Sequence, residues 1–170
     1  TPTHACEVPV MPQTGTRLAP SCEVRRIVFD EIEAFQNFAG MVERYADESA
    51  IPGMPRPNRQ KEMYRQLEQA GLFHLVGAFV GGELVGFVSL LASVLPHYGV
   101  MVASTESIFV EPEHRKSGAG KMLLHEAERL ATSIGAVGLL VSAPSGGRLA
   151  AILPRSGYQE SNRVFFRRLA

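Results

Sequence analysis

The sequence predicts a single-domain mixed α/β fold in which helices flank a central sheet. Three observations lead to this prediction. The 170 residues are enough for one substantial core but few for two domains. Apolar runs typical of strands are interleaved with amphipathic runs at helical spacing. Between residues 105 and 124, an apolar strand passes through a basic, glycine-bearing turn into a helix.

The N-terminal part of the chain divides into an arm, a strand and a helix. Residues 1–20 carry four prolines and no helical period, so we expect an extended arm ahead of a domain that spans 21–170. Alternation over 22–29 predicts the first strand. Asp30 is then expected to cap a helix that ends near Asp47.

For the whole domain, the sequence predicts the element order β-α-α-β-β-β-α-β-α-β. Gly71 is expected to close the second helix, and Gly81-Gly82 has the composition of a two-residue hairpin turn. The expected elements are a helix over 58–70, strands over 73–80, 83–95 and 100–110, a helix over 119–133, a strand over 136–143, a helix over 148–155 and a strand over 163–169.

Composition excludes several classes of protein. With 17 basic and 17 acidic side chains and 45% hydrophobic residues, the chain lacks the excess positive charge of a general nucleic-acid binder. Cys6 and Cys22 are too few for a disulfide framework and lack metal-site spacing, so we expect a reducing, cytoplasmic environment. No apolar run reaches the ~18 residues of a membrane span, and residues 1–20 do not resemble a signal peptide.

The basic turn has the features of an anion site. Gly118 and Gly120 let the backbone approach a ligand, and the first N–H groups of the following helix point toward it. Arg115, Lys116 and Lys121 add positive charge to the positive end of the helix. The sequence therefore predicts phosphate binding at this turn.

Two common phosphate-binding motifs do not fit this turn. A dinucleotide fingerprint needs a third glycine, and position 123 is Leu123. A nucleotide-triphosphate loop needs Gly-Lys-Ser/Thr, whereas Gly120-Lys121 is followed by Met122.

The motif Arg115-x-x-Gly118-x-Gly120, preceded by a strand ending in Val110-x-Pro112, resembles the acyl-CoA signature of the GCN5-related N-acetyltransferase (GNAT) family. The resemblance covers about residues 22–169. It implies a mixed sheet in which two parallel strands splay apart. It also implies an N-acetyltransferase that moves acetyl from acetyl-CoA to a primary amine by direct attack.

The same resemblance implies where acetyl-CoA lies. The pantetheine arm would pair with the strand before the turn, and the pyrophosphate would lie on the turn itself. The alternative is that the charges are solvated and the glycines only turn the chain. The residues implied for the co-substrate are Ile108, Phe109, Val110, Arg115, Lys116, Ser117, Gly118, Ala119, Gly120 and Lys121.

Glu106 is the candidate general base. Strict strand alternation would place its carboxylate on the same face as Ile108 and Val110. Some members of the GNAT family carry a functional glutamate at this position. The alternative role is that of a structural carboxylate at the sheet edge.

The general acid is where the sequence departs from the family. Leu153 occupies the place of the family's tyrosine that protonates the leaving thiolate. Tyr98, His97 and Ser142 remain as candidate acids, since the loop with Tyr98 and His97 is expected to face the acceptor. A second alternative is a thiolate that leaves unassisted, because its pKa resembles the ~8.5 of cysteine.

The sequence is also compatible with other functions. A GNAT-shaped module that binds acyl-CoA or a protein partner without turnover is one, and an acyltransferase acting on a hydroxyl or a carboxylate is another. The acceptor would be bound by the least patterned segments, 49–58 and 95–101, which do not identify it. A homodimer is compatible with the sequence.

Overall fold

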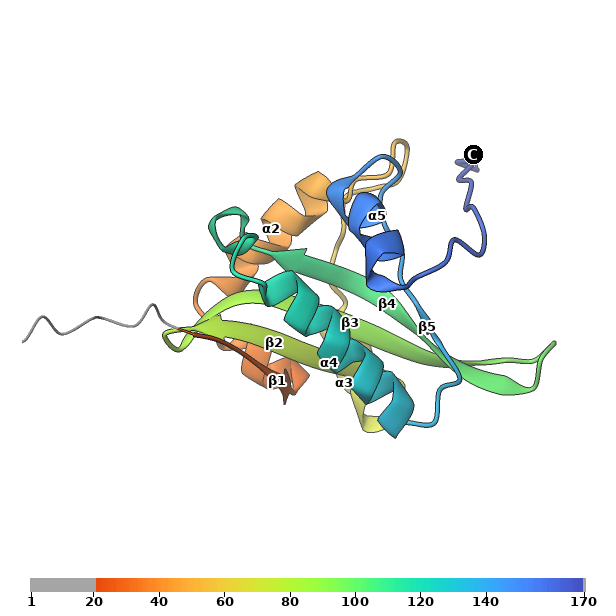
Figure 1. Cartoon of the computed structure of the whole chain (residues 1–170), viewed down its shortest axis with the longest axis horizontal. Coiled ribbons are helices and arrows are strands. Elements are labelled where there is room, and N and C mark those ends of the chain that lie inside the picture. The colour runs from red at the N-terminus through yellow and green to blue at the C-terminus, as the bar shows by residue number, and fades with distance from the viewer. Residues whose placement is uncertain (1–20, 170) are drawn as a thin grey trace, which may run out of the picture.

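The computed structural model describes residues 21–169, so the predicted arm over residues 1–20 lies outside the described part. Five strands form one sheet in the order β1-β2-β3-β4-β5 within this part (Figure 1). Neighbouring strands are antiparallel except β4 and β5, which are parallel. The strands are β1 (Cys22–Ile27), β2 (Phe73–Val80), β3 (Glu83–Leu95), β4 (Val100–Val110) and β5 (Leu139–Leu140).

Helices cover both faces of the sheet. α4 packs across one face, where it contacts β1, β2, β3 and β4 (Figure 1). α1, α2 and α3 pack against the other face, and α5 follows β5. The helices are α1 (Phe29–Glu33), α2 (Phe38–Glu48), α3 (Lys61–Gln69), α4 (Ala119–Ser133) and α5 (Arg148–Ile152), with 3-10 turns at Pro112–His114 and Leu153–Ser156.

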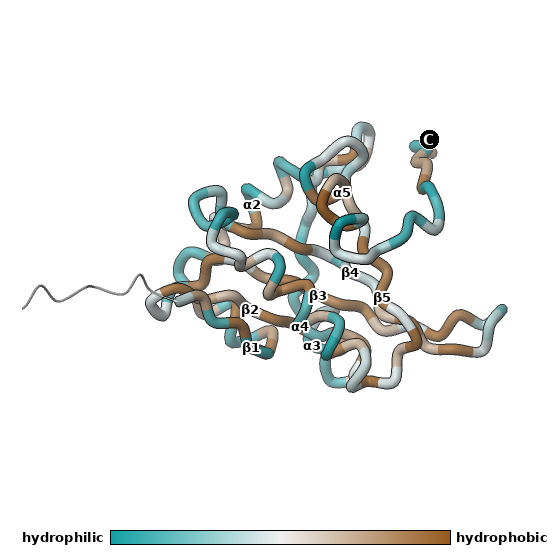
Figure 2. The backbone as a smooth tube through the Cα atoms, viewed as in Figure 1, coloured by the Kyte–Doolittle hydropathy of each residue, from teal (hydrophilic) through white to brown (hydrophobic). Residues whose placement is uncertain are grey.

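Side-chain alternation along the central strands creates two hydrophobic cores. On β2, Phe73 and Leu75 face α1 and α2, whereas Val76 and Ala78 face α4. Because both faces are buried, the central strands are almost continuously apolar (Figure 2). The sheet therefore separates an aromatic core, beneath α1, α2 and α3, from an aliphatic core beneath α4.

The predicted first helix is wrong in one respect, because it is two helices. α1 ends at Glu33 and α2 begins at Phe38. The Asn37 amide group, in the intervening turn, donates to the backbone oxygen of Leu84 at 2.8 Å and ties the turn to β3. Asp30 does not cap the helix either; it lies in the first turn and pairs with Arg65 at 2.8 Å.

The C-terminal part of the prediction also needs correction. β5 contains two residues rather than the eight expected over 136–143, because the chain diverges from β4 beyond Leu140. The helix expected over 148–155 is α5 followed by a 3-10 turn. The strand expected over 163–169 does not form. A strand needs a neighbour with free backbone groups, and no described strand pairs with this segment.

Candidate active site

A β-bulge in β4 places Glu106. Across the β3–β4 ladder, Ser89 lies opposite Ser107 and Leu90 lies opposite Thr105, so Glu106 is the extra residue without a partner. One inserted residue reverses the alternation on one side of the bulge. The direction of this side chain is therefore not the one that strict alternation predicts.

The expectation that Glu106 shares a face with Ile108 and Val110 is wrong. Ile108 and Val110 pack into the core beneath α4. Glu106 and Ser107 instead line a cavity on the opposite face, beneath α2 and α3. The bulge is the physical reason, because it turns two consecutive side chains toward the same side of the sheet.

Hydroxyl groups hold the Glu106 carboxylate. Tyr64 of α3 donates to Glu106 Oε1 at 2.9 Å, and Ser89 of β3 donates to Glu106 Oε2 at 2.7 Å. The Ser89 oxygen in turn accepts from the Ser107 N–H at 3.1 Å and lies 2.6 Å from the Ser107 hydroxyl. Since a hydroxyl has one proton, and Ser89 gives it to the carboxylate, Ser107 is the donor in that pair.

Tyr64 and Tyr45 are site residues that sequence reasoning missed. Burial, and then the negative charge of Glu106, raise the pKa of the Tyr64 phenol, so it stays protonated and keeps donating. The Tyr45 hydroxyl of α2 lies 3.4 Å from the backbone oxygen of Glu106, and burial raises its pKa as well. The sequence places each tyrosine on an amphipathic helix, but it does not indicate which strand the helix covers.

A small apolar cavity adjoins the carboxylate. It has a volume of about 70 Å³ and lies between the sheet and the three N-terminal helices. Apart from Glu106, Arg59 is the other charged residue among those that line it. The residues that line it are Phe29, Ile32, Phe38, Val42, Tyr45, Pro57, Arg59, Tyr64, Phe73, Leu75, Phe87, Ser89, Glu106 and Ser107.

β4 and β5 separate at the end nearest the basic turn. They pair at Ala103 with Leu139 and at Ser104 with Leu140. The last contact is the Ser142 N–H, which donates to Thr105 Oγ1 at 3.1 Å. The predicted splay of the two parallel strands is therefore confirmed.

The splay leaves backbone groups of β4 open. The Glu111 N–H donates to the Val85 oxygen of β3 at 2.9 Å. Because backbone direction alternates along a strand, the N–H groups of Ile108 and Val110 point away from β3, toward the gap. Beyond Ser104, no described strand pairs with this edge of β4. An extended ligand could bind there by backbone hydrogen bonds.

The basic turn leads into the N-terminus of α4. Gly118 has φ +88°, which a side chain rarely adopts, and it caps the helix. The Ala119 N–H is bonded to Ser117 Oγ at 3.3 Å. The next two N–H groups, of Gly120 and Lys121, belong to the first helical turn and have no partner within the helix. These groups could bind an anion.

The arginine of this turn is engaged by the protein. Arg115 Nε donates to the Val110 oxygen at 2.9 Å, and Arg115 Nη2 pairs with Glu48 of α2 at 2.6 Å. Its guanidinium also lies over the Phe109 ring at 5.4 Å. Lys116 is exposed and has no ion pair with another described residue. A bound phosphate would therefore have to compete with Glu48 for Arg115.

The structure does not bring His97 and Tyr98 to the Glu106 carboxylate. Both lie in the turn of the long β3–β4 hairpin, which projects from the body of the molecule (Figure 1). Tyr98 is 71% exposed. Glu106 lies six residues beyond Val100 along β4, a span of about 20 Å at ~3.3 Å per residue.

The structure also shows the surroundings of three other residues. Leu153 is buried, so the position of the missing tyrosine is part of the core. Tyr158 donates to Glu128 of α4 at 2.7 Å. Glu111 is buried and accepts two hydrogen bonds from Arg44.

Comparison with known proteins identifies the family and the fold. The profile of the Acetyltransferase (GNAT) family matches residues 39–151, about two thirds of the chain. The chain belongs to the GNAT acetyltransferase family. The matched range includes the Glu106 bulge, the strand gap and the basic turn. No curated protein matches significantly.

Solved structures show the same fold at low sequence identity. The ribosomal-protein-alanine N-acetyltransferase from Brucella melitensis biovar Abortus 2308 is 20% identical, with a TM-score of 0.67 over 88% of this chain and 100% of that chain. An aminoglycoside acetyltransferase from an uncultured soil metagenomic sample, in complex with sisomicin, is 16% identical, with a TM-score of 0.67 over 88% and 97%. AAC(6')-Iy, in complex with a CoA-linked bisubstrate analogue, is 21% identical, with a TM-score of 0.66 over 88% and 98%.

Residues 21–169 contain neither a membrane-spanning helix nor a cluster of metal ligands. No helix there has the length and apolarity needed to cross a membrane. No group of three or more His, Cys, Asp or Glu side chains is arranged to hold a metal ion.

Proposed function

We propose that this GNAT domain transfers the acetyl group of acetyl-CoA to a primary amine by direct attack. The observation that carries the proposal is the position of Glu106. Its bulge lies on β4 between the open strand gap, which suits an extended thioester, and the apolar cavity, which suits an acceptor. A donor and an acceptor bound on either side of β4 would therefore meet at this residue.

The donor half of the site would use backbone groups and the basic turn. The pantetheine arm would bind the open edge of β4 at Ile108 and Val110. The pyrophosphate would lie at the N-terminus of α4, on the N–H groups of Gly120 and Lys121, with Lys116 nearby. A Cβ built at Gly120 would have only Val110 Cγ2 within 4 Å, at 3.8 Å, so the surface beside this glycine is accessible rather than filled.

The acceptor half would use the Glu106 carboxylate. It attracts an ammonium ion and accepts one proton from it, which frees the nitrogen lone pair. The nitrogen then attacks the thioester carbonyl carbon, and the C–S bond breaks as the C–N bond forms. Two protons then remain on the nitrogen; one passes to the thiolate or to solvent, and the other stays on the amide product. Tyr64 and Ser89, which donate to both carboxylate oxygens, hold the group toward the acceptor.

The leaving thiolate would depart without a protein acid. Leu153 stands where the family's tyrosine stands, and its side chain is buried. Tyr98 and His97 lie at the far end of the hairpin. A thiol with a pKa like the ~8.5 of cysteine is a fair leaving group near neutral pH, so an acid is not required.

Leu153, which stands where the family has a tyrosine, favours one alternative, a GNAT-fold module that binds acyl-CoA or a protein partner without turnover. A thiol-release assay with acetyl-CoA and a broad panel of primary amines distinguishes the two. Thiol release that depends on an amine supports the enzyme. Calorimetric binding of coenzyme A without release in the whole panel would favour the module, and absence of binding would exclude both the enzyme and the acyl-CoA-binding module.

A further inference from the structure

The cavity beside Glu106 carries information about the acceptor. We infer that the acceptor is a primary amine with one positive charge and a short, uncharged aliphatic group that occupies this cavity. The inference rests on the proposed function, because it names the substrate class of the same site. It follows from the lining of the cavity, its volume and the distribution of charge around it.

The lining and volume define the carbon skeleton. Rings and aliphatic groups make up nearly all of the wall, including Phe38 and Val42 of the helices and Leu75 and Phe87 of the sheet. An apolar cavity binds an apolar group because burial removes its surface from water. The volume of about 70 Å³ limits the size of that group. A short branched or linear alkyl group fits; a sugar ring with several hydroxyl groups does not.

The position of the amine follows from the unpaired carboxylate. Within residues 21–169, Glu106 accepts hydrogen bonds from two neutral hydroxyl groups and has no ion pair. A carboxylate oxygen can accept more than one hydrogen bond, so an ammonium group can join Tyr64 and Ser89. The hydroxyl of Tyr64 contacts the carboxylate and the hydroxyl of Tyr45 contacts the Glu106 backbone oxygen, so neutral groups surround the place where the ammonium would bind.

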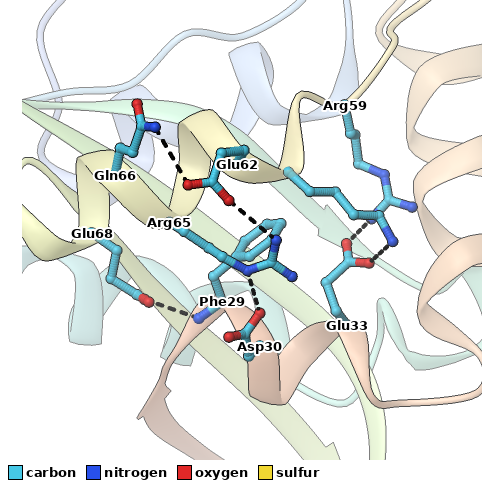
Figure 3. A network of polar contacts seen from close by, with 9 residues as sticks. Phe29, Asp30, Glu33, Arg59, Glu62, Arg65, Gln66 and Glu68 are labelled. Carbon is cyan, nitrogen blue, oxygen red and sulfur yellow. Dashed lines mark hydrogen bonds and ion pairs between the residues drawn. The ribbon is translucent and has the colours of Figure 1, made fainter.

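The part of the cavity wall formed by Arg59 disfavours a second positive charge on the acceptor. Arg59, two residues before α3, pairs with the Glu33 carboxylate (Figure 3). Lys61, the first residue of α3, pairs with the same carboxylate. This group of three side chains therefore carries one net positive charge. Arg59 also lies over the Phe38 ring at 5.2 Å and lines the cavity. A diamine whose second ammonium entered the cavity would meet both an apolar wall and this cation.

Steady-state kinetics with matched amines tests the inference. The probes are isoamylamine, which has one charge and a branched alkyl group, 1,4-diaminobutane, which has a second charge, and ethylamine, which lacks most of the alkyl group. We expect kcat/KM for isoamylamine to exceed each of the others by at least about tenfold, the usual effect of a pocket on one or more methylene groups. A preference for 1,4-diaminobutane, or equal values, would overturn the inference while leaving the proposed function intact.

A variant that fills the cavity provides a second test. Val42 is half-buried and lines the cavity from α2, so Val42→Phe should reduce its volume. We expect the isoamylamine advantage over ethylamine to fall at least about fivefold. Val137→Phe, at a residue 70% exposed in the loop before β5, is the matched control and should keep the advantage. An unchanged ratio in a folded Val42→Phe protein would contradict the role of the cavity.

A binding measurement tests the amine preference of the cavity independently of turnover. If no amine is acetylated, the proposed function fails. Calorimetric titration of isoamylamine and 1,4-diaminobutane into the protein alone then decides whether the cavity still selects a monocationic aliphatic amine. Tighter binding of isoamylamine to wild type, lost in Glu106→Gln, supports the assignment of the cavity. Equal or absent binding of both amines would overturn it.

Discussion

The Ser89 hydroxyl of β3 lies 2.7 Å from Glu106 Oε2 on β4, although Glu106 has no partner in the strand ladder. Ser89 is buried and also receives the N–H of Ser107. One serine therefore both closes the bulge and orients the carboxylate.

Glu106→Gln should separate binding from chemistry. The amide keeps the size and the hydrogen-bonding reach of the carboxylate but cannot take a proton from an ammonium ion. We expect turnover to fall by ~10²–10⁴-fold, the usual contribution of general-base catalysis. The affinity for coenzyme A, measured by calorimetry, should stay within about twofold, because Glu106 does not belong to the proposed donor half. Turnover at the original rate across pH would remove the assignment.

Ser89→Ala should lower stability and activity together. It leaves the Ser107 N–H buried without its acceptor and removes one donor to Glu106. An unpaired buried polar group costs about 1–3 kcal/mol, so the free energy of unfolding in urea should fall by that amount. Ser93→Ala, near the end of the same strand, is the control and should change stability by less than about 0.5 kcal/mol. Equal effects of the two substitutions would show that the Ser89 contacts contribute little.

The order and type of most elements could be predicted from the sequence because they depend on local pattern. α4 begins at Ala119 and ends at Ser133 as expected, since a glycine in the left-handed region precedes it. The strand gap was expected from the resemblance alone. The family resemblance placed Glu106 at the site, but the alternation argument gave it the wrong face.

The remaining features depend on tertiary contacts. A bulge is the difference in length between two paired strands, and neither strand alone reveals it. Tyr64 meets Glu106 because α3 crosses the sheet at that point, which no spacing within the helix determines. The segment 163–169 has a strand-like composition, but β5 is too short to pair with it. Its Val164 and Phe165 are therefore 89% and 88% exposed.

The turn before α4 can be tested by a glycine substitution. A Cβ at Gly120 would lie 3.8 Å from Val110 Cγ2, an ordinary contact, so Gly120→Val should fold. The branched side chain would nevertheless cover the first N–H groups of α4. We expect the Kd for coenzyme A to rise at least about tenfold, or about 1.4 kcal/mol. Gly135→Val, at the other end of α4, is unsuited as a control because its φ is +82°, so Gly138→Val serves instead. Unchanged affinity in a folded Gly120→Val protein would exclude phosphate binding here.

Arg115→Ala should have a smaller effect on the donor than the glycine substitution. The guanidinium already pairs with Glu48, and the pair is partly exposed, so salt screens its charge. We expect coenzyme A affinity to fall about threefold at low ionic strength and less at high salt. The double substitution Arg115→Ala with Glu48→Ala should recover part of the loss, because it also removes the competing carboxylate. Calorimetry at two salt concentrations measures both effects, and a loss above about tenfold would show that Arg115 binds phosphate directly.

Tyr64→Phe should change how stability depends on pH. Burial and the charge of Glu106 raise the pKa of Tyr64 above the ~10 of an unfolded chain. Above pH ~10 the unfolded chain loses this proton while the folded protein keeps it, so the stability contributed by Tyr64 is complete below pH ~10 and is lost as pH rises through the folded value. Urea unfolding of the wild type should therefore show a steeper loss of stability above pH ~10 than Tyr64→Phe. At pH 7 the variant should be less stable by about 1 kcal/mol, for the lost hydrogen bond. Tyr98→Phe, at an exposed site, should retain the wild-type slope, and a Tyr64→Phe slope equal to both would show that Glu106 and burial do not act on this phenol.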